Sequence, residues 1–307
     1  MTPAYEKARK HLDAGDLLIL DGGVSTELQR RGISMQDDLW SGRAVLDAWE
    51  GVVDMHRAYI DAGATVITAN TYASSRLMLE PAGLGDRVEQ INRLAVDAAL
   101  EARERAGTPD LLVAASMSHM VPIPAGGYRV DPGARPGRQV MQQAFAELAA
   151  LHTAAGADVL LLEMMSARQA MGAMFDALAD AALPVWCGQS AVAGVDGRLR
   201  SWHEPEVAYR EIVAVAAQHD FEALGIMHTR ADLVDEALPV IRSHYAGPIM
   251  AYPDSGYLQM PDWRFGETIA PARFARFAEG WRGAGAQIIG GCCGLGPEHI
   301  AAIADLK

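Results

Sequence analysis

The chain has 307 residues, of which 50% are hydrophobic and 21% are charged, a balance typical of a globular rather than a disordered protein. Its 26 Lys and Arg against 39 Asp and Glu give a formal net charge of −13, which argues against proteins that bind nucleic acids or anionic membrane surfaces. No run of about 18 apolar residues is present to span a bilayer, and three cysteines are too few for a disulfide framework. Because the first residues are polar and lack an apolar signal core, we expect a cytoplasmic protein with no membrane or nucleic-acid partner.

Short apolar runs alternate with longer amphipathic runs along the whole chain. The apolar runs are nearly continuous, as in parallel strands covered on both faces, and predict strands at 17–22, 65–71, 111–117, 159–164, 184–190, 223–229, 248–253 and 286–292. Helical periodicity lies near 47–62, 86–106, 138–155, 167–181, 205–218, 231–243, 271–284 and 297–305. Five glycines follow helical runs where a left-handed residue is needed, namely Gly63, Gly107, Gly156, Gly247 and Gly285.

Eight strands, each followed by a helix, predict the α/β class and a (β/α)8 TIM barrel, formed by residues 1–307 as a single domain. A doubly wound open sheet is the alternative. Three long irregular stretches, 23–46, 118–137 and 253–270, follow strands. In a barrel they would lie on the face where the strands end, which is the face that carries the active site.

Polar residues end nearly every predicted strand, which indicates a polar pocket at one mouth of the barrel. In chain order they are Asp21, Thr68, Asn70, Tyr72, Ser116, Ser118, His119, Glu163, Gln189, Ser190, His228, Tyr252, Asp254, Cys292 and Cys293. Asp21 and Glu163 would recognise an ammonium group, although both could instead cap helices or act as a general acid and base. Five aromatic residues fall near the predicted mouth and would suit a cationic ligand: Trp40, Tyr72, Tyr128, Trp186 and Tyr252.

The segment Gly290–Gly294 (GGCCG) places adjacent thiols between glycines at a strand end. Thiolates prefer soft or borderline metals such as Zn²⁺, and a tetrahedral site needs a third protein ligand if one position stays open for catalysis. His228, at the end of another strand, is the candidate. The alternative is that Cys292 and Cys293 are small buried residues and His228 is an ordinary polar group.

Six segments at or near predicted strand ends each carry a distinct short motif. In chain order they are Leu20–Leu28 (LDGGVSTEL), Ala69–Ser74 (ANTYAS), Leu161–Met165 (LLEMM), Ala223–Ile226 (ALGI), Tyr252–Gly256 (YPDSG) and Gly290–Ile300 (GGCCGLGPEHI). Together they resemble motifs of the homocysteine S-methyltransferase family, whose usual forms are LDGGxGTEL, TNTYxAS, ET(I/M)P, ALGxNC, YPNSG and GGCCGxxPxHI. The resemblance extends over about residues 16–305.

The resemblance implies a zinc-dependent (β/α)8 barrel that moves a methyl group from an onium or folate donor to the sulfur of homocysteine, giving methionine. It implies a substrate-binding set of Asp21, Thr68, Asn70, Tyr72 and Glu163, in which the two acids contact the amino group of the acceptor. The family's third zinc ligand is the Cys of its NC pair, where this chain has Met227 and His228. The expected metal set is therefore His228, Cys292 and Cys293, whose neutral imidazole would make the zinc a stronger Lewis acid.

We therefore expect a methyltransferase that uses a small onium donor, such as S-methylmethionine, S-adenosylmethionine or a betaine, with homocysteine as acceptor. A cobalamin-dependent version is disfavoured because the barrel occupies the whole chain. The alternative is a divergent zinc barrel that acts on a different methylated substrate or acceptor, since His228 replaces the usual Cys. A non-catalytic ligand-binding barrel is a third reading, and an oligomer is compatible with all three.

Overall fold

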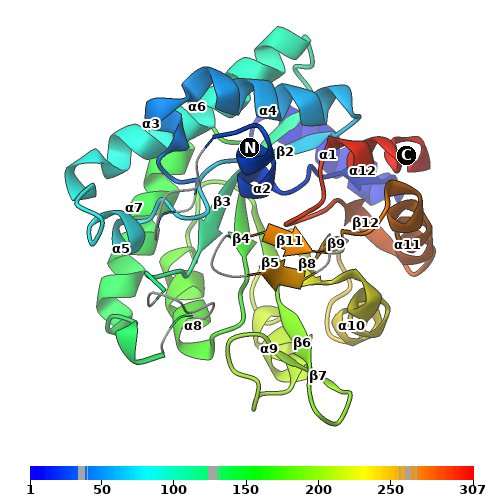
Figure 1. Ribbon diagram of the computed structural model, residues 1–307. Helices are drawn as coiled ribbons and strands as arrows, with labels where there is room; N and C mark the ends of the chain where they lie inside the picture. Colours follow the sequence, from blue (N-terminus) through cyan, green and yellow to red (C-terminus); the bar gives the residue numbers. More distant parts are fainter. Residues whose placement is uncertain are drawn as a thin grey trace.

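The computed structural model describes the chain except for residues 34–38, 40, 124–129, 131, 256, 260–263 and 267. Its centre is a parallel barrel (Figure 1) whose strands are β1 (Leu18–Ile19), β2 (Val66–Ala69), β3 (Leu112–Ser118), β4 (Val159–Glu163), β5 (Val185–Gln189), β8 (Ala223–Arg230), β9 (Ile249–Asp254) and β12 (Ala286–Ile289). Neighbours in the order β1-β12-β9-β8-β5-β4-β3-β2 are hydrogen-bonded, and a parallel bridge between Leu20 and Val66 joins the two ends. The predicted barrel is thus confirmed over the open sheet.

Helices surround the barrel (Figure 1), and the predicted ones are present with shifted ends: α4 (Trp49–Asp61), α6 (Val88–Ala106), α7 (Arg138–Ala155), α8 (Arg168–Ala177), α9 (Tyr209–Ala216), α10 (Val234–Arg242), α11 (Pro271–Gly283) and α12 (Pro297–Ala301). The sequence analysis did not predict α1 (Pro3–Ala14), α2 (Val24–Arg30), α3 (Ala44–Asp47) or α5 (Arg76–Leu79). Short 3-10 turns in the described part of the chain are η2 (Gly85–Arg87), η3 (Pro132–Ala134), η4 (Ala231–Leu233) and η5 (Ala304–Leu306). Four of the five expected glycines have positive φ, but Gly247 does not, so that assignment was wrong.

Two hairpins add to the face where the strands end. They are β6 (Ala191–Ala193) with β7 (Leu199–Ser201), and β10 (Tyr257–Gln259) with β11 (Arg264–Gly266). The first hairpin directly follows β5 and leads the chain to Trp202, beside the barrel mouth. No helix in the described part of the chain is long and apolar enough to cross a membrane.

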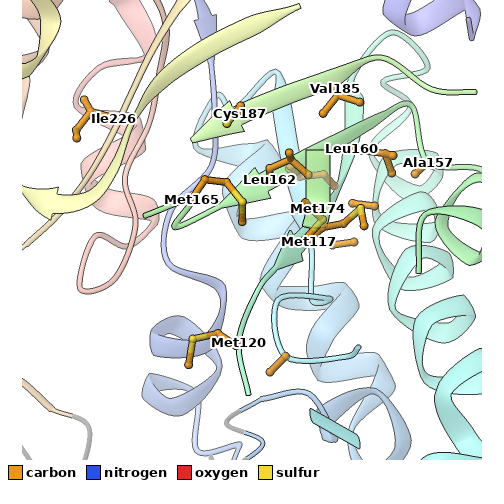
Figure 2. Close-up of a cluster of buried hydrophobic side chains, with 14 of the residues drawn as sticks. Met117, Met120, Ala157, Leu160, Leu162, Met165, Met174, Val185, Cys187 and Ile226 are labelled. Atoms are coloured by element: carbon orange, nitrogen blue, oxygen red, sulfur yellow. The ribbon is translucent and has the colours of Figure 1, made fainter. Parts of the chain in front are cut away.

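Alternate strand residues form two separate apolar layers, which explains why the strands read as continuous apolar runs. The outward layer packs under the helices, and Figure 2 shows part of it, including Leu160, Leu162 and the fully buried Cys187. The inward layer fills the barrel with side chains such as Leu18, Leu161, Trp186, Met250 and Ile288.

Helix α1 closes the end of the barrel where the strands begin. Its buried face, formed by Ala4, Tyr5, Ala8 and Leu12, belongs to the inward layer. Tyr5 packs on Trp186 with ring centroids 6.4 Å apart, and the indole Nε1 donates to the Tyr5 hydroxyl at 3.3 Å. Trp186 therefore lies at the closed end, and its expected position near the mouth was wrong.

The inward positions become polar at the other end of the strands. Every second residue of a strand points into the barrel. In β2, β3 and β4 the inward-pointing residue that follows the apolar ones is Thr68, Ser116 and Glu163, respectively. The same periodicity that fills the barrel thus lines its mouth with groups able to bind a polar ligand.

Candidate metal and substrate site

A pocket opens at the mouth of the barrel, where the polar strand ends meet. Seven of the eight residues predicted for the site line it: Thr68, Asn70, Tyr72, Glu163, His228, Cys292 and Cys293. Asp21 is fully buried and is not among the lining residues. The remaining lining residues are Gly23, Val24, Ser25, Ala69, Ser116, Met164, Met227 and Tyr252.

Four metal-type donors converge at one side of this pocket. Ligand atoms of His228, Asp254, Cys292 and Cys293 all lie within 4.8 Å of one another. The Cys292 sulfur is 3.9 Å from the Cys293 sulfur and 3.9 Å from His228 Nδ1, which is 3.2 Å from an Asp254 carboxylate oxygen. Asp254 was expected at the end of its strand but not among the metal ligands.

The donor set fits a tetrahedral zinc ion. Zinc bonds of about 2.0–2.3 Å to nitrogen, oxygen and sulfur place the ligand atoms of a tetrahedron roughly 3.3–3.8 Å apart, close to the separations above. The second carboxylate oxygen of Asp254, Oδ1, is buried and has no hydrogen-bond partner in the described part of the chain. Thiolate, imidazole and carboxylate are all zinc ligands, so the chemistry of the set agrees with its geometry.

Mutual contacts shift the proton affinities of the donors. A hydrogen bond with Cys292 lowers the pKa of the Cys293 thiol to about 7, although burial opposes this. Burial also disfavours a charged His228, but Asp254 and Cys293 outweigh it and raise the pKa of the ring well above its usual value. The contacts within the cluster thus favour the thiolate form of Cys293 and the protonated form of the His228 ring.

Close backbone packing fixes the cysteine loop against the ends of β1 and β9. The Gly291 N–H donates to the Asp21 carbonyl at 2.9 Å, and the Cys292 N–H donates to the Pro253 carbonyl at 2.7 Å. A Cβ on Gly290 would lie 2.6 Å from the Leu20 carbonyl oxygen, so only glycine allows this approach. His228 itself adopts a left-handed φ of 40°, which is uncommon for a residue with a Cβ.

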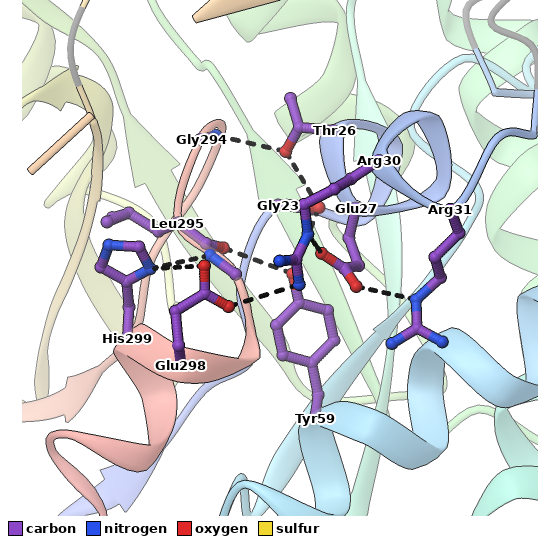
Figure 3. Close-up of polar contacts among 11 residues, drawn as sticks. Gly23, Thr26, Glu27, Arg30, Arg31, Tyr59, Gly294, Leu295, Glu298 and His299 are labelled. Atoms are coloured by element: carbon purple, nitrogen blue, oxygen red, sulfur yellow. Dashed lines mark hydrogen bonds and ion pairs between the residues drawn. The ribbon is translucent and has the colours of Figure 1, made fainter. Parts of the chain in front are cut away.

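A second set of contacts ties the cysteine loop to α2 (Figure 3). The Gly294 N–H donates to the Thr26 hydroxyl at 3.2 Å, and that hydroxyl donates to the Gly23 carbonyl at 3.1 Å. The Gly23 N–H in turn donates to the Leu295 carbonyl at 3.0 Å, to which the Tyr59 hydroxyl also donates. The loop that carries both cysteines is therefore held on a scaffold that does not include the thiols.

Two acids lie beneath and beside the pocket, as the sequence predicted, but they differ in their surroundings. Asp21 accepts hydrogen bonds from the Thr68 N–H at 2.6 Å, the Thr68 hydroxyl at 2.9 Å and the Tyr252 hydroxyl at 3.4 Å. Burial raises the pKa of Asp21 to about 7 and that of Glu163 to about 8. Glu163 is the acid that faces the pocket, while Asp21 holds Thr68 and Tyr252 in place.

The other predicted substrate residues are also in contact with the protein. The Asn70 amide donates to the Ser41 carbonyl at 2.7 Å and accepts from the Ser41 hydroxyl at 2.7 Å, which fixes its orientation. The Tyr72 hydroxyl lies 2.8 Å from the Met164 sulfur. Trp40 and Tyr128 lie outside the described residues.

Sequence reasoning missed Trp202, whose ring centroid lies 5.7 Å from that of His228. The residue follows a short hairpin rather than a strand end, so the rule that finds barrel sites does not reach it. Among the predicted aromatics, Tyr72 and Tyr252 do line the pocket.

Comparison with known proteins agrees with this geometry. The sequence model described as homocysteine S-methyltransferase matches residues 18–306. Over 320 residues the chain is 29% identical to homocysteine S-methyltransferase YbgG of Bacillus subtilis (strain 168), with 95% of each protein covered.

Solved structures of the homocysteine methyltransferase MmuM from Escherichia coli resemble the fold over nearly the whole length. The oxidized form has a TM-score of 0.79 and 28% identity, covering 96% of this chain and 98% of that one. The metallated form has a TM-score of 0.76 and 26% identity, covering 97% and 99%, so this relative is known with a bound metal. The barrel is a methyltransferase, and the chain belongs to the homocysteine S-methyltransferase family.

Proposed function

We propose that this enzyme is zinc-dependent and transfers a methyl group from a small onium donor, such as S-methylmethionine, S-adenosylmethionine or a betaine, to the thiol of homocysteine, giving methionine. One observation carries the proposal: the donors His228, Cys292 and Cys293 share a pocket with the buried acid Glu163. An amino acid that ends in a thiol offers a sulfur to the first group and an ammonium to the second.

His228, Cys292 and Cys293 would hold the zinc, and Asp254 offers a fourth donor when no substrate is present. Bound zinc supplies a Lewis acid that lowers the pKa of a coordinated thiol. This chemistry is needed because an aliphatic thiol has a pKa of about 8.5 and is mostly protonated at pH 7.

The residues of the chain position the reactants. Glu163 accepts hydrogen bonds from the acceptor ammonium, and Asp21 orients the neighbouring Thr68 and Tyr252. The acceptor thiol would release its proton to solvent when coordinated. Its sulfur then forms a bond to the methyl carbon while the bond from that carbon to the donor's sulfonium sulfur or ammonium nitrogen breaks. The electron pair of the broken bond stays on the donor, which leaves as a neutral sulfide or amine, so no general acid is required. The contribution of the protein is alignment and exclusion of water.

We also propose that residues 1–307 form one domain. Helix α1 packs on the inward layer of the barrel, and Ile300 of α12 and Ile303 pack on its outward layer, so both ends of the chain are held by the same barrel.

The test is zinc content of the purified protein together with methylation of homocysteine by each of the three donors. We expect about one zinc per chain in the wild type. We expect loss of zinc and at least a 100-fold loss of methylation in His228→Ala and Cys292→Ala, since each removes a ligand of a three-residue site.

Cys187→Ala is the matched control, because Cys187 is a buried cysteine in the outward layer and not in the metal cluster. It should keep its zinc and its activity. Zinc retained with no transfer to homocysteine from any donor would exclude the proposed acceptor and favour a divergent barrel with another substrate. Activity that persists in a zinc-free Cys292→Ala protein would exclude the zinc mechanism.

A further inference from the structure

Two buried methionines connect the acid of the pocket to the metal cluster. Met164 directly follows Glu163, and Met227 directly precedes His228 in β8. Both line the pocket, belong to the inward layer of the barrel and are 3% and 0% exposed. The Met164 N–H donates to the Met227 sulfur at 3.1 Å, so an unbroken series of contacts runs from Glu163 to His228. We call Met164 and Met227 the methionine floor of the pocket.

The backbone around the floor is shaped to hold it. Met164 has a left-handed φ of 57°, which is uncommon for a residue with a Cβ. The next N–H, that of Met165, donates to the Gly188 carbonyl of β5 at 3.0 Å. A Cβ on Gly188 would lie 2.9 Å from Met227 Cγ and 3.0 Å from its sulfur, so glycine leaves the room that the Met227 side chain occupies.

The sulfur atoms of the floor already have hydrogen-bond donors from the protein. The Tyr72 hydroxyl donates to the Met164 sulfur at 2.8 Å, and the Met227 sulfur accepts from the Met164 N–H. A thioether is a weak acceptor and has no hydrogen to donate. The floor therefore offers a ligand a polarisable apolar surface rather than polar partners.

The nearby hydroxyls of the pocket do not change this. Those of Thr68 and Tyr252 both donate to Asp21. The Ser116 hydroxyl is buried and has no hydrogen-bond partner in the described part of the chain. Ser116 lies in β3, which pairs with β4 two residues before Glu163, so it belongs to the acid end of the pocket and not to the floor.

A ligand that joins Glu163 to the metal cluster must lay its middle atoms along this floor. Hydrocarbon atoms there gain contact with the two methionines, whereas a hydroxyl gives up water without gaining a good partner. The floor therefore distinguishes acceptors by what lies between their two functional ends.

We propose that Met164 and Met227 are specificity-determining residues, which select an acceptor whose ammonium and thiol are joined by an unsubstituted hydrocarbon chain. The inference rests on the proposed function for the ammonium at Glu163 and the thiol at the metal. Both positions depart from the motif forms given above, where ET(I/M)P has Thr and ALGxNC has Asn. Two polar residues are thus replaced by apolar ones at positions that touch each other.

The experiment measures binding of two thiols to the zinc-loaded protein by calorimetry, in the absence of a methyl donor. The probes are 3-aminopropane-1-thiol and 1-amino-3-mercaptopropan-2-ol, the latter as each enantiomer. They have the same ammonium, thiol and chain length and differ only in a hydroxyl on the middle carbon. We expect the wild type to bind the first probe about 10-fold or more tighter than either enantiomer of the second, the range for a buried hydroxyl without a good partner.

In Met227→Gln this preference should fall to less than about 2-fold, because the amide has nearly the same length and supplies both a donor and an acceptor. Met227→Leu is the matched control. It removes the sulfur but keeps an apolar side chain, so it should keep the wild-type preference. Met164→Gln tests the other half of the floor and should also weaken the preference, which keeps the inference testable if Met227→Gln does not fold.

Three results would overturn the inference. They are a wild type that binds neither probe or binds both equally, a preference that survives in Met227→Gln and Met164→Gln, and a preference lost in Met227→Leu as fully as in Met227→Gln. The last result would show that the shape of the Met227 side chain matters and its polarity does not.

Binding is measured without turnover, so the two proposals can fail separately. If the preference behaves as expected while homocysteine is never methylated, the role of the floor stands and the proposed reaction fails. If homocysteine is methylated but both Gln variants keep the wild-type preference, the reaction stands and the role of the floor fails.

Discussion

Two buried acids, Glu163 in the pocket and Asp21 behind it, lower the stability of the folded protein while Glu163 can bind a cation. Glu163 and Asp21 are buried in positions where ionisation is unfavourable, because burial raises both pKa values. A buried acid of this kind favours binding of a cationic group, which supplies the missing countercharge. The same burial destabilises the empty folded protein at a pH where the acids must ionise.

We predict that Glu163→Gln makes this cost visible. The folded pKa is about 8 against an ordinary 4.5, so between these values the folded state holds a proton that the unfolded state has lost. Stability from this group is therefore full below the unfolded pKa and is lost as pH rises through 8. Urea unfolding of the metal-free protein should show Glu163→Gln gaining at least about 1 kcal/mol on the wild type between pH 5 and pH 8.5.

The same variant should bind homocysteine about 10-fold or more weakly, because the acceptor ammonium loses its charged partner. A difference in unfolding free energy between variant and wild type that is the same at both pH values would contradict the account of Glu163.

The sequence was enough to predict most of the residues that line the pocket. It was not enough to predict which of their side chains come within bonding distance of one another. The residues at strand ends were found because apolar runs stop there, and seven of the eight line the pocket. Asp254 was found as a strand-end residue without its role, because only the fold turns its carboxylate to within 3.2 Å of His228.

At the level of elements, the loop after β12 determines where the thiols lie. Gly290 and Gly291 let it pass directly over the end of β1, and hydrogen bonds to Asp21 and Pro253 fix its course. A side chain there would push apart the strand end that carries Asp21 and the loop that carries Cys292.

Gly290→Ala should therefore weaken zinc binding although Gly290 is not a metal ligand. Its Cβ would meet the carbonyl oxygens of Leu20 and Asp21 at 2.6 and 2.7 Å, which is overlap with backbone rather than with a movable side chain. We expect a loss of about 1–3 kcal/mol in unfolding free energy and a weaker hold on zinc, measured by urea unfolding and competition with a chelator.

Gly280→Ala, in helix α11, is the control, because a Cβ there meets nothing within 4 Å. It should leave zinc binding unchanged and stabilise the protein by about 0.5–1 kcal/mol, as expected for glycine replaced in a helix. Equal stability and equal zinc affinity of Gly290→Ala and the wild type would show that the loop is not positioned by this contact.

The elements differ in how far the sequence could predict them. Strands covered on both faces read as continuous apolar runs, and all eight were found. Helix α1 was missed because its four buried residues are spread through a polar segment. The hairpin β6–β7 was missed because two three-residue strands are too short to show a period, and Trp202 was missed with it.

The two ends of the barrel have different roles: one holds the apolar core that stabilises the fold, and the other holds the candidate site. One end is filled by Tyr5, Trp186 and the apolar inward layer, while the other carries Glu163 and the cluster of His228, Asp254, Cys292 and Cys293. The net charge of −13 would also favour the approach of a cationic donor of the kind proposed.

In the proposed reaction, His228, Cys292 and Cys293 hold a zinc ion that takes the acceptor's sulfur. Zinc X-ray absorption of the loaded protein, before and after addition of homocysteine, tests it most directly. We predict two sulfur ligands at about 2.3 Å with nitrogen or oxygen completing the set, and three sulfur ligands once homocysteine is bound. A sulfur count that stays at two in saturating homocysteine, or a site without sulfur, would contradict the account.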